Sequence, residues 1–124
     1  MANILSVKSE DTWTEGKRCL DAGMVNSAAN RIYYSVFQAV KGYAIHRGSW
    51  TMETTDRVHT DALKFVEQSG KLGRFYRSKM NELFSLRVLA DYYPDTVIKK
   101  DLEELLADAD SIRRHHISRC ADKT

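Results

Sequence analysis

Apolar side chains recur at every third or fourth position along most of this chain, and no stretch alternates apolar and polar residues for long. That spacing places side chains on one face of an α-helix. We predict a long amphipathic helix over the most regular run, from Val25 to Arg47. Its apolar face consists of Val25, Ala29, Ile32, Val36, Val40 and Tyr43, widened by Tyr33, Phe37 and Ala44.

Small and polar residues mark both ends of this helix. Gly23 fits the end of a preceding helix, because glycine readily adopts the left-handed conformation found there. Asn26 or Ser27 is expected to cap the new helix. Gly48 and Ser49 are expected to end it.

Four more helices follow from the same spacing. We predict them over residues 5–22, from near Thr55 to Ser69, from about Leu72 to Tyr93, and in the last thirty residues. Pro94 would end the fourth, and Asp95 or Thr96 would cap the fifth. The expected inward positions are Leu5, Trp13, Cys19 and Leu20; Val58, Ala62, Phe65 and Val66; Leu72, Tyr76, Met80, Leu83 and Ala90, flanked by Phe75, Phe84 and Leu86; and Ile98, Leu102, Leu105, Ala109 and Ile112.

These elements predict an all-α fold: an up-and-down antiparallel helical bundle of four longer helices plus one shorter helix. Its 124 residues are enough for one domain, over 1–124. The least regular connection, after Gly48, carries Trp50 and Met52, which either serve function or cover the end of the bundle.

Composition narrows the class of protein. A net charge of +2 does not favour sequence-blind nucleic-acid binding, although a local basic patch remains open. No apolar run approaches the roughly 20 residues of a membrane span, and the first residues do not resemble a secretory signal. Cys19 and Cys120 are far apart in the sequence. We therefore expect a cytoplasmic protein with reduced thiols and no membrane association.

Three segments in order, "AANRIYYSVFQAVKGYAIHRG", "VHTDALKFV" and "LFSLRVLADYY", resemble the HEPN family, named for higher eukaryotes and prokaryotes nucleotide-binding, and most closely its small prokaryotic branch. The resemblance extends from about Trp13 to Ile112. The matching residues are Ala28, Arg31, Tyr33, Tyr34 and Phe37, then His59, then Arg87, Ala90, Asp91 and Tyr92.

The resemblance implies a helical bundle that forms homodimers and acts beside a minimal nucleotidyltransferase, as in toxin–antitoxin pairs. Active HEPN ribonucleases carry an arginine followed four to six residues later by histidine, and they cut RNA without a metal. Arg87 matches that arginine. Tyr92, Tyr93 and Pro94 follow where the histidine would fall. The ribonuclease hypothesis therefore lacks its acid–base group at the expected place.

Arg87 and Asp91 stand one helical turn apart and are the candidate catalytic residues. In one interpretation they form a partly buried ion pair that fixes helix packing. In the other, Arg87 binds a phosphate through its forked guanidinium and Asp91 orients it. Pairing with arginine lowers the pKa of a carboxyl, which argues against Asp91 as a proton shuttle.

The candidate ligand-binding residues are Arg31, Tyr33, Tyr34, His59 and Tyr92. The adjacent tyrosines point in different directions on a helix, so one can pack in the core or a dimer interface while the other stacks on a base. His59 either holds the preceding loop or supplies the missing acid–base group.

The tail "SIRRHHISR" is basic. Its charges either complement the end of a helix or contact phosphate. His115 and His116 are adjacent and lack the spacing of a helical metal pair. No nucleotide-binding glycine motif is present, and we expect neither metal nor cofactor.

Three functions follow. The first is a homodimeric module, joined through the second and fourth of the five predicted helices, that binds a nucleotide or RNA and a minimal nucleotidyltransferase. The second is a metal-independent ribonuclease using Arg87 with an unusual second group. The third is a purely structural helical adaptor.

Overall fold

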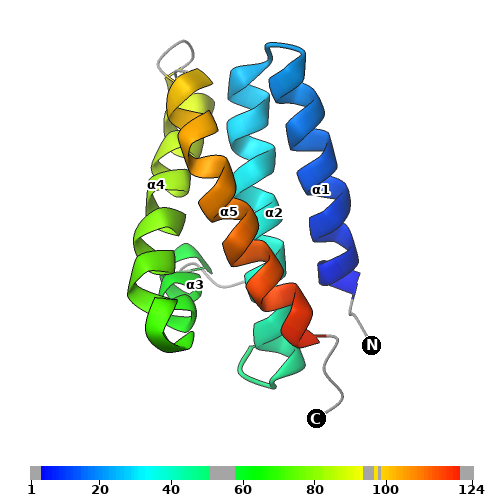
Figure 1. Ribbon diagram of the computed structural model, residues 1–124, viewed down its shortest axis with the longest axis vertical. Helices are drawn as coiled ribbons and strands as arrows, with labels where there is room; N and C mark the ends of the chain where they lie inside the picture. The colour runs from blue at the N-terminus through cyan, green and yellow to red at the C-terminus, as the bar shows by residue number, and fades with distance from the viewer. Residues whose placement is uncertain (1–3, 51–57, 94–96, 98, 121–124) are drawn as a thin grey trace.

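The computed structural model describes residues 4–50, 58–93, 97 and 99–120, and these form helices joined by turns, with no strand among them. Four long helices alternate in direction and lie side by side, with a short fifth helix near one end (Figure 1). The prediction of an all-α bundle is confirmed. The elements are α1 (Ile4–Asp21), α2 (Val25–His46), α3 (Val58–Glu67), the 3-10 turn η1 (Gly70–Leu72), α4 (Gly73–Tyr92) and α5 (Lys99–Cys120).

Helix α2 is the centre of the bundle, packed against α1, α4 and α5. Because neighbours cover it on several sides, its buried positions extend beyond one stripe and are mostly small or β-branched. Burying such side chains is the main favourable term in folding. The fully or nearly fully buried apolar residues of α2 are Ala28, Ala29, Ile32, Tyr33, Val36, Ala39, Val40 and Ala44.

Helices α1 and α2 approach closely at Gly16. A Cβ added there would lie 2.7 Å from Cδ1 of Ile32 and 3.2 Å from Cβ of Arg31. Glycine lowers helix propensity, so Gly16 makes the sequence pattern of α1 weaker while it allows the tight packing of the two helices. This contact places Arg31 beside α1.

The predicted ends of α2 are only partly correct. Gly23 and Gly48 have positive φ angles and close the turns after α1 and α2, as predicted. Asn26 and Ser27 are not caps, because the cap position is Met24 and α2 already includes both residues. The turn at Gly23 leads directly into α2, and Met24 at the cap position makes no side-chain cap hydrogen bond.

The predicted inward position of Leu72 is also wrong, since this side chain is 50% exposed. Leu72 belongs to η1, whose tighter winding puts it out of phase with the apolar face of α4. Phe75, expected beside that face, is 45% exposed. The expected helix start near Thr55, the Pro94 stop, the Asp95 or Thr96 cap, Ile98 and Met52 lie outside the described residues.

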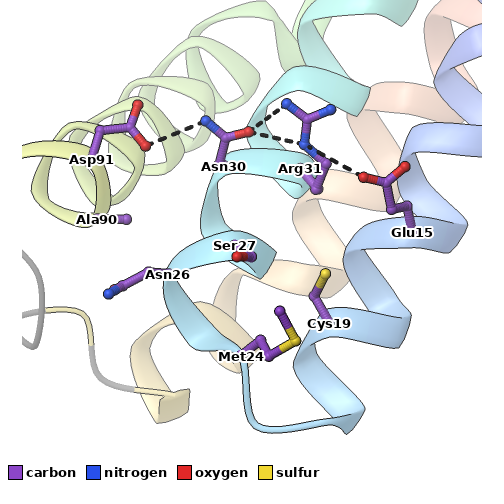
Figure 2. Close-up of a pocket in the computed structure, with 9 residues that line it drawn as sticks. All are labelled: Glu15, Cys19, Met24, Asn26, Ser27, Asn30, Arg31, Ala90 and Asp91. Atoms are coloured by element: carbon purple, nitrogen blue, oxygen red, sulfur yellow. Dashed lines mark hydrogen bonds and ion pairs between the residues drawn. The ribbon is translucent and has the colours of Figure 1, made fainter.

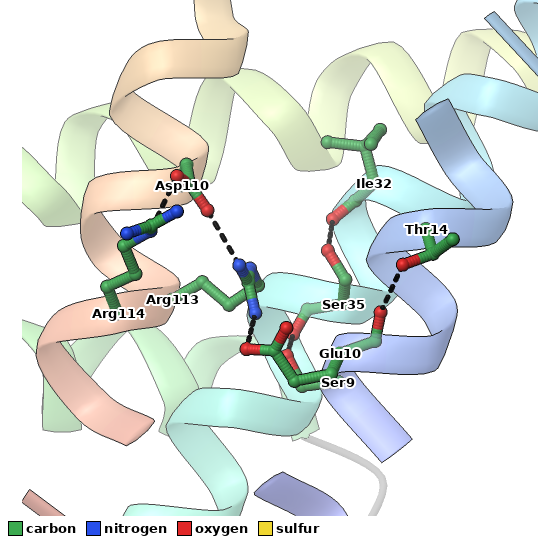
Figure 3. A network of polar contacts seen from close by, with 8 residues as sticks. All are labelled: Ser9, Glu10, Thr14, Ile32, Ser35, Asp110, Arg113 and Arg114. Atoms are coloured by element: carbon green, nitrogen blue, oxygen red, sulfur yellow. Dashed lines mark hydrogen bonds and ion pairs between the residues drawn. The ribbon is translucent and has the colours of Figure 1, made fainter. Parts of the chain in front are cut away.

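Part of the basic tail is inside the bundle. Arg113 and His116 are buried in α5, whereas Arg114 and Arg119 are exposed. Arg113 reaches Glu10 of α1 and Asp110 of α5, and the nearby Ser9 hydroxyl donates to the backbone oxygen of Ser35 in α2 (Figure 3). Polar contacts thus join α1, α2 and α5.

Two further features agree with the expectations. Cys19 and Cys120 are both free thiols. The helices of the described ranges include none with the length and apolar character of a membrane span.

Candidate functional site

Arg87 lies where α4 faces α2, and its guanidinium is shared between a hydroxyl and a carboxylate. Its Nη2 donates to the Tyr34 hydroxyl at 3.0 Å. Its Nε is 3.0 Å from Oδ2 of Asp91, one turn along α4, but is not aligned to donate a hydrogen bond. The side chain is 21% exposed. The guanidinium is therefore neither sealed in the core nor fully engaged by its neighbours.

A second guanidinium reaches the same tyrosine. The central guanidinium carbon of Arg87 is 5.3 Å from the centre of the Tyr34 ring, and that of Arg31 is 5.6 Å from it. Arginine is attracted to the electron-rich face of an aromatic ring at such distances. Arg31 is 35% exposed. Two partly exposed positive charges therefore lie next to the Tyr34 ring.

Asn30 connects Arg31 to Asp91, the carboxylate beside Arg87, through its amide, and Figure 2 shows Asn30, Arg31 and Asp91. Its oxygen accepts hydrogen bonds from Nε and Nη2 of Arg31 at 2.9 and 2.5 Å. Its Nδ2 donates to Oδ1 of Asp91 at 3.4 Å. On the other side, Arg31 makes a long ion pair of 4.0 Å with Glu15 of α1. A row of polar contacts therefore crosses from α4 over α2 to α1.

Two pockets adjoin this row. We call the first the Arg31 pocket; it has a volume of about 530 Å³, and Figure 2 shows Arg31, Asn30 and Asp91 around it. The second, the Gln38 pocket, has about 340 Å³ and also includes Arg31, together with Tyr34. Its Gln38 Oε1 is buried without a hydrogen-bond partner. Both volumes are in the range that holds a small ligand, about 300–1,000 Å³.

The other residues that line these pockets come from α1, α2, α4 and the turn between α1 and α2. In the Arg31 pocket they are Glu15, Cys19, Met24, Asn26, Ser27 and Ala90, and in the Gln38 pocket they are Lys8, Asp11, Thr12 and Glu15.

Tyr33 and His59 form a separate hydrogen-bonded group beside Phe84. Tyr33 is 3% exposed, and its hydroxyl lies 2.8 Å from Nδ1 of His59. Nε2 of His59 lies 3.3 Å from Oδ1 of Asn81. Because the amide oxygen can only accept, this network assigns the ring proton to Nε2 and makes Nδ1 the acceptor of the tyrosine proton.

His59 is held neutral near Arg87. Its ring stacks on Phe84 with centres 3.6 Å apart, and the Arg87 guanidinium carbon is 5.9 Å from the same Phe84 ring. Burial lowers the pKa of His59, the hydrogen bond to Asn81 opposes this, and the charge of Arg87 lowers it further. Burial raises the pKa of Tyr33 far above its usual range. The histidine and the arginine therefore both lie against one phenylalanine, the histidine neutral and the arginine positive at neutral pH.

The structure thus brings together most of the residues singled out in the sequence. Arg31, Tyr34, Arg87 and Asp91 share one row, and His59 is beside it. Tyr33 offers little surface to a ligand because it is buried. Tyr92, at the end of α4, is 69% exposed. Most of the loop that His59 was expected to hold, residues 51–57, lies outside the described residues.

Sequence reasoning missed Asn30, Gln38 and Asn81. Each is an amide within or beside the site, and each was overlooked because Asn and Gln are ordinary on exposed helix faces. One clue was available for Asn30 and Gln38. Each is four residues from Tyr34 along α2, so all three share a face of the helix.

This arrangement suits the binding of an anion. Forked guanidinium groups match the oxygens of phosphate, and both of these groups lie over the Tyr34 ring, which holds them close together. Within the described part of the chain, no group of three or more His, Cys, Asp and Glu side chains is placed to hold a metal ion.

Comparison with known protein families gives a match over most of the chain. A family model described as "HEPN domain" matches residues 3–119. No curated protein matches the chain.

Proposed function

The chain belongs to the HEPN domain family, and we propose that it is a homodimeric module that binds a nucleotide or RNA and acts with a minimal nucleotidyltransferase in a toxin–antitoxin-like pair. The partner and the pairing come from the resemblance of the sequence to the small prokaryotic members. The ligand class is supported by the geometry of Arg31, Tyr34 and Arg87.

The observation that carries the proposal is the convergence of Arg31 and Arg87 on Tyr34. Two positive groups that are 35% and 21% exposed can reach a phosphate without unfolding the bundle. Asp91 contacts the buried Nε of Arg87 without an aligned hydrogen bond, so the exposed part of the guanidinium is left to a phosphate. In this proposal Asp91 positions the arginine and transfers no proton. Arg31 and Arg87 each contact a phosphate of the ligand, and the Tyr34 hydroxyl keeps Arg87 in place.

The test is titration of a fluorescent RNA oligomer and of labelled nucleotides with the protein in low salt. Arg87→Gln is expected to weaken binding by about tenfold or more, because a charge-assisted hydrogen bond is lost. Arg74→Gln is the matched control, since Arg74 is exposed in the first turn of the same helix. Equal affinities for the wild type and Arg87→Gln, or a flat thermal shift with every nucleotide and RNA, would leave the structural adaptor as the better description.

The protein partner is tested separately. We expect the reading frame next to this one to encode a minimal nucleotidyltransferase, and the two products to copurify. For the homodimer, the exposed Tyr92 and Tyr93 at the end of α4 provide apolar surface to cover. Light scattering at micromolar concentration that gives only the 14.2 kDa mass of one chain would contradict the dimer.

One observation favours a ribonuclease as the second candidate: His59 and Arg87 both lie against Phe84. A neutral histidine could take the proton of a ribose 2′-hydroxyl as its oxygen attacks the neighbouring phosphorus. Arg87 would stabilise the charge on the phosphate oxygens, the bond to the 5′-oxygen would break, and water would protonate that oxygen. The product would be a cyclic phosphate.

The hydrogen bonds of His59 make this the weaker candidate. Its Nδ1 accepts from Tyr33 and its Nε2 faces Asn81, so the lone pair that a base needs is occupied. We therefore expect no cleavage of RNA in EDTA by the purified protein. Cleavage that is lost in both Arg87→Ala and His59→Asn would establish the ribonuclease instead, whereas cleavage that survives Arg87→Ala would point to a contaminant or to another site.

A further inference from the structure

A third pocket lies near the C-terminal ends of α2 and α5. Both helices end on the same side of the bundle (Figure 1). The pocket has a volume of about 180 Å³. We call it the basic end pocket. The residues that matter here are Tyr43 and Arg47 of α2, Phe65 of α3, Ser69 before η1, and His115 and Arg119 of α5.

The arginine and histidine side chains that the basic end pocket brings together are not balanced by any acidic side chain in the described part of its lining. Among the described residues that line it there are two arginines and a histidine but no aspartate or glutamate. The Arg31 and Gln38 pockets, by contrast, each include carboxylates. The acidic residue nearest in sequence to Ser69 is Glu67, and its carboxylate is engaged by Arg77. An anion entering the basic end pocket would therefore meet no carboxylate among these lining side chains.

Helix ends account for only part of the donors of these arginines. The carbonyl end of a helix attracts cations, and α2, α3 and α5 all end near here. However, the last carbonyls of α2 and α3 already accept backbone N–H groups from the turns that follow. The Arg47 guanidinium lies over the Tyr43 ring, 5.8 Å from its centre, and Arg119 uses Nη1 on the oxygen of His115. Both side chains are exposed and retain other donors.

The size of the pocket limits the ligand. Sites for whole drug-sized molecules have about 300 Å³ or more, so a volume of about 180 Å³ suits a single small group. Its wall is aromatic, because Tyr43 and Phe65 meet edge to face with ring centres 5.7 Å apart. Tyr43 also brings a hydroxyl that can donate a hydrogen bond to an oxyanion.

We propose that the basic end pocket binds one phosphate group, held by Arg47 and Arg119. Two planar guanidinium groups and a phenol match the oxygens of a tetrahedral anion. The site is separate from the row of Arg31, Tyr34 and Arg87, so it does not depend on the function proposed above. The phosphate can belong to a free nucleotide, to the end of an RNA or to an RNA backbone.

The first test is titration of the full chain with inorganic phosphate, followed by NMR shifts of the Ser69 and Gly70 amides and by calorimetry. We expect saturable binding that Arg47→Gln and Arg119→Gln each weaken by about tenfold or more. Arg18→Gln is the matched control, because Arg18 is exposed on α1 and belongs to none of these pockets. Arg47→Lys and Arg119→Lys should lose less than the glutamine variants, since they keep the charge.

Three results would overturn the proposal. They are shifts that never saturate, equal losses in Arg18→Gln and the two pocket variants, and unchanged affinity in both Arg47→Gln and Arg119→Gln. Melting curves of the variants exclude loss through unfolding. Arg87→Gln is expected to leave phosphate binding in this pocket unchanged, which separates the result from the outcome for the first site.

A second titration identifies the source of the phosphate. The probes are a nucleoside monophosphate and one short RNA prepared with either a 5′-phosphate or a 5′-hydroxyl. Preference for the 5′-phosphorylated RNA assigns the pocket to terminal phosphates, and equal binding of both RNAs assigns it to the backbone. Binding of the monophosphate alone assigns it to free nucleotides. Failure of all three probes to compete with inorganic phosphate would contradict a biological phosphate ligand.

Discussion

The availability of Arg87 depends on one carboxylate. Asp91 is within 3.0 Å of the guanidinium, and its side chain is 30% exposed. An ion pair between two partly exposed side chains that lacks an aligned hydrogen bond contributes little to stability, about 0–1 kcal/mol. Asp91 therefore keeps Arg87 in place, and an anion that displaces Asp91 loses little binding free energy by breaking this pair.

We predict that Asp91→Asn increases the affinity for RNA or nucleotide by up to about fivefold, which corresponds to losing a competing pair of about 1 kcal/mol. The measurement is the same fluorescence titration. Glu103→Gln is the control for net charge, since Glu103 is an exposed acid on α5. A decrease in affinity for Asp91→Asn would mean that the carboxylate positions Arg87 more than it competes for it.

A buried histidine makes the stability depend on pH. Burial lowers the pKa of His116 to about 4, opposed by its bond to the Ile112 oxygen and helped by the nearby His115 and Arg119. The unfolded chain has the usual pKa of about 6.5 and binds a proton first as the pH falls. This contribution to stability is therefore complete above about pH 6.5 and decreases as the pH falls towards 4.

We predict that His116 alone accounts for about 2 kcal/mol of lost stability between pH 7 and pH 5. Urea unfolding at both pH values measures it. His116→Gln should show a smaller loss than the wild type, whatever its absolute stability, and His46→Gln, at an exposed position, should behave as the wild type. The pKa values of His59 and His115 are also lowered, so part of the dependence should remain. Identical pH profiles for His116→Gln and the wild type would contradict this assignment.

Two neighbouring arginines of α5 contribute to the packing of helices in different ways. Arg113 and Arg114 both contact Asp110, at 2.7 and 2.8 Å (Figure 3). Only 3% of the Arg113 side chain is exposed, against 74% for Arg114. Arg113 also reaches Glu10 at 2.5 Å and lies over Trp13, 5.0 Å from its ring centre. It therefore fastens α5 to α1, whereas Arg114 stays on the surface.

We predict that Arg113→Ala lowers the free energy of unfolding by about 2–3 kcal/mol through lost packing and charged hydrogen bonds. The cost stays below that of stranding a buried charge, because Glu10 remains 57% exposed. Arg114→Ala should change it by no more than about 0.5 kcal/mol. Urea unfolding at pH 7 compares the two, and equal effects would refute the distinction.

For the molecule as a whole, the small net charge makes any nucleic-acid binding depend on few contacts. A chain of net charge +2 has no strong general field for RNA. If Arg31 and Arg87 contact two phosphates, the logarithm of the binding constant should fall against the logarithm of the salt concentration with a slope of about −1.4.

We predict that Arg31→Gln reduces this slope to about −0.7, because one phosphate contact is lost. Fluorescence titrations at several salt concentrations give both slopes. A much steeper slope in the wild type would instead indicate a broad basic surface.

The periodicity of apolar residues was sufficient to identify the helices, the all-α bundle and the glycine turns at Gly23 and Gly48, and the motifs identified the family. These are local properties, because a helix and its turns are specified by residues a few positions apart. The same locality explains the errors. Leu72 fits the apolar spacing, but the tight turn of η1 rotates it outward, and Asn26 and Ser27 resemble caps although Gly23 and Met24 already complete the turn.

The packing of helices was needed to reveal the sites. Arg31 and Arg87 meet at Tyr34, and His59 and Arg87 meet at Phe84, because α2, α3 and α4 place residues distant in the sequence side by side. The burial of Arg113 and His116 likewise follows from their neighbours and not from their polar side chains. The pattern along one helix indicates which side chains share a face, but their charge state and exposure depend on what the other helices bring against that face.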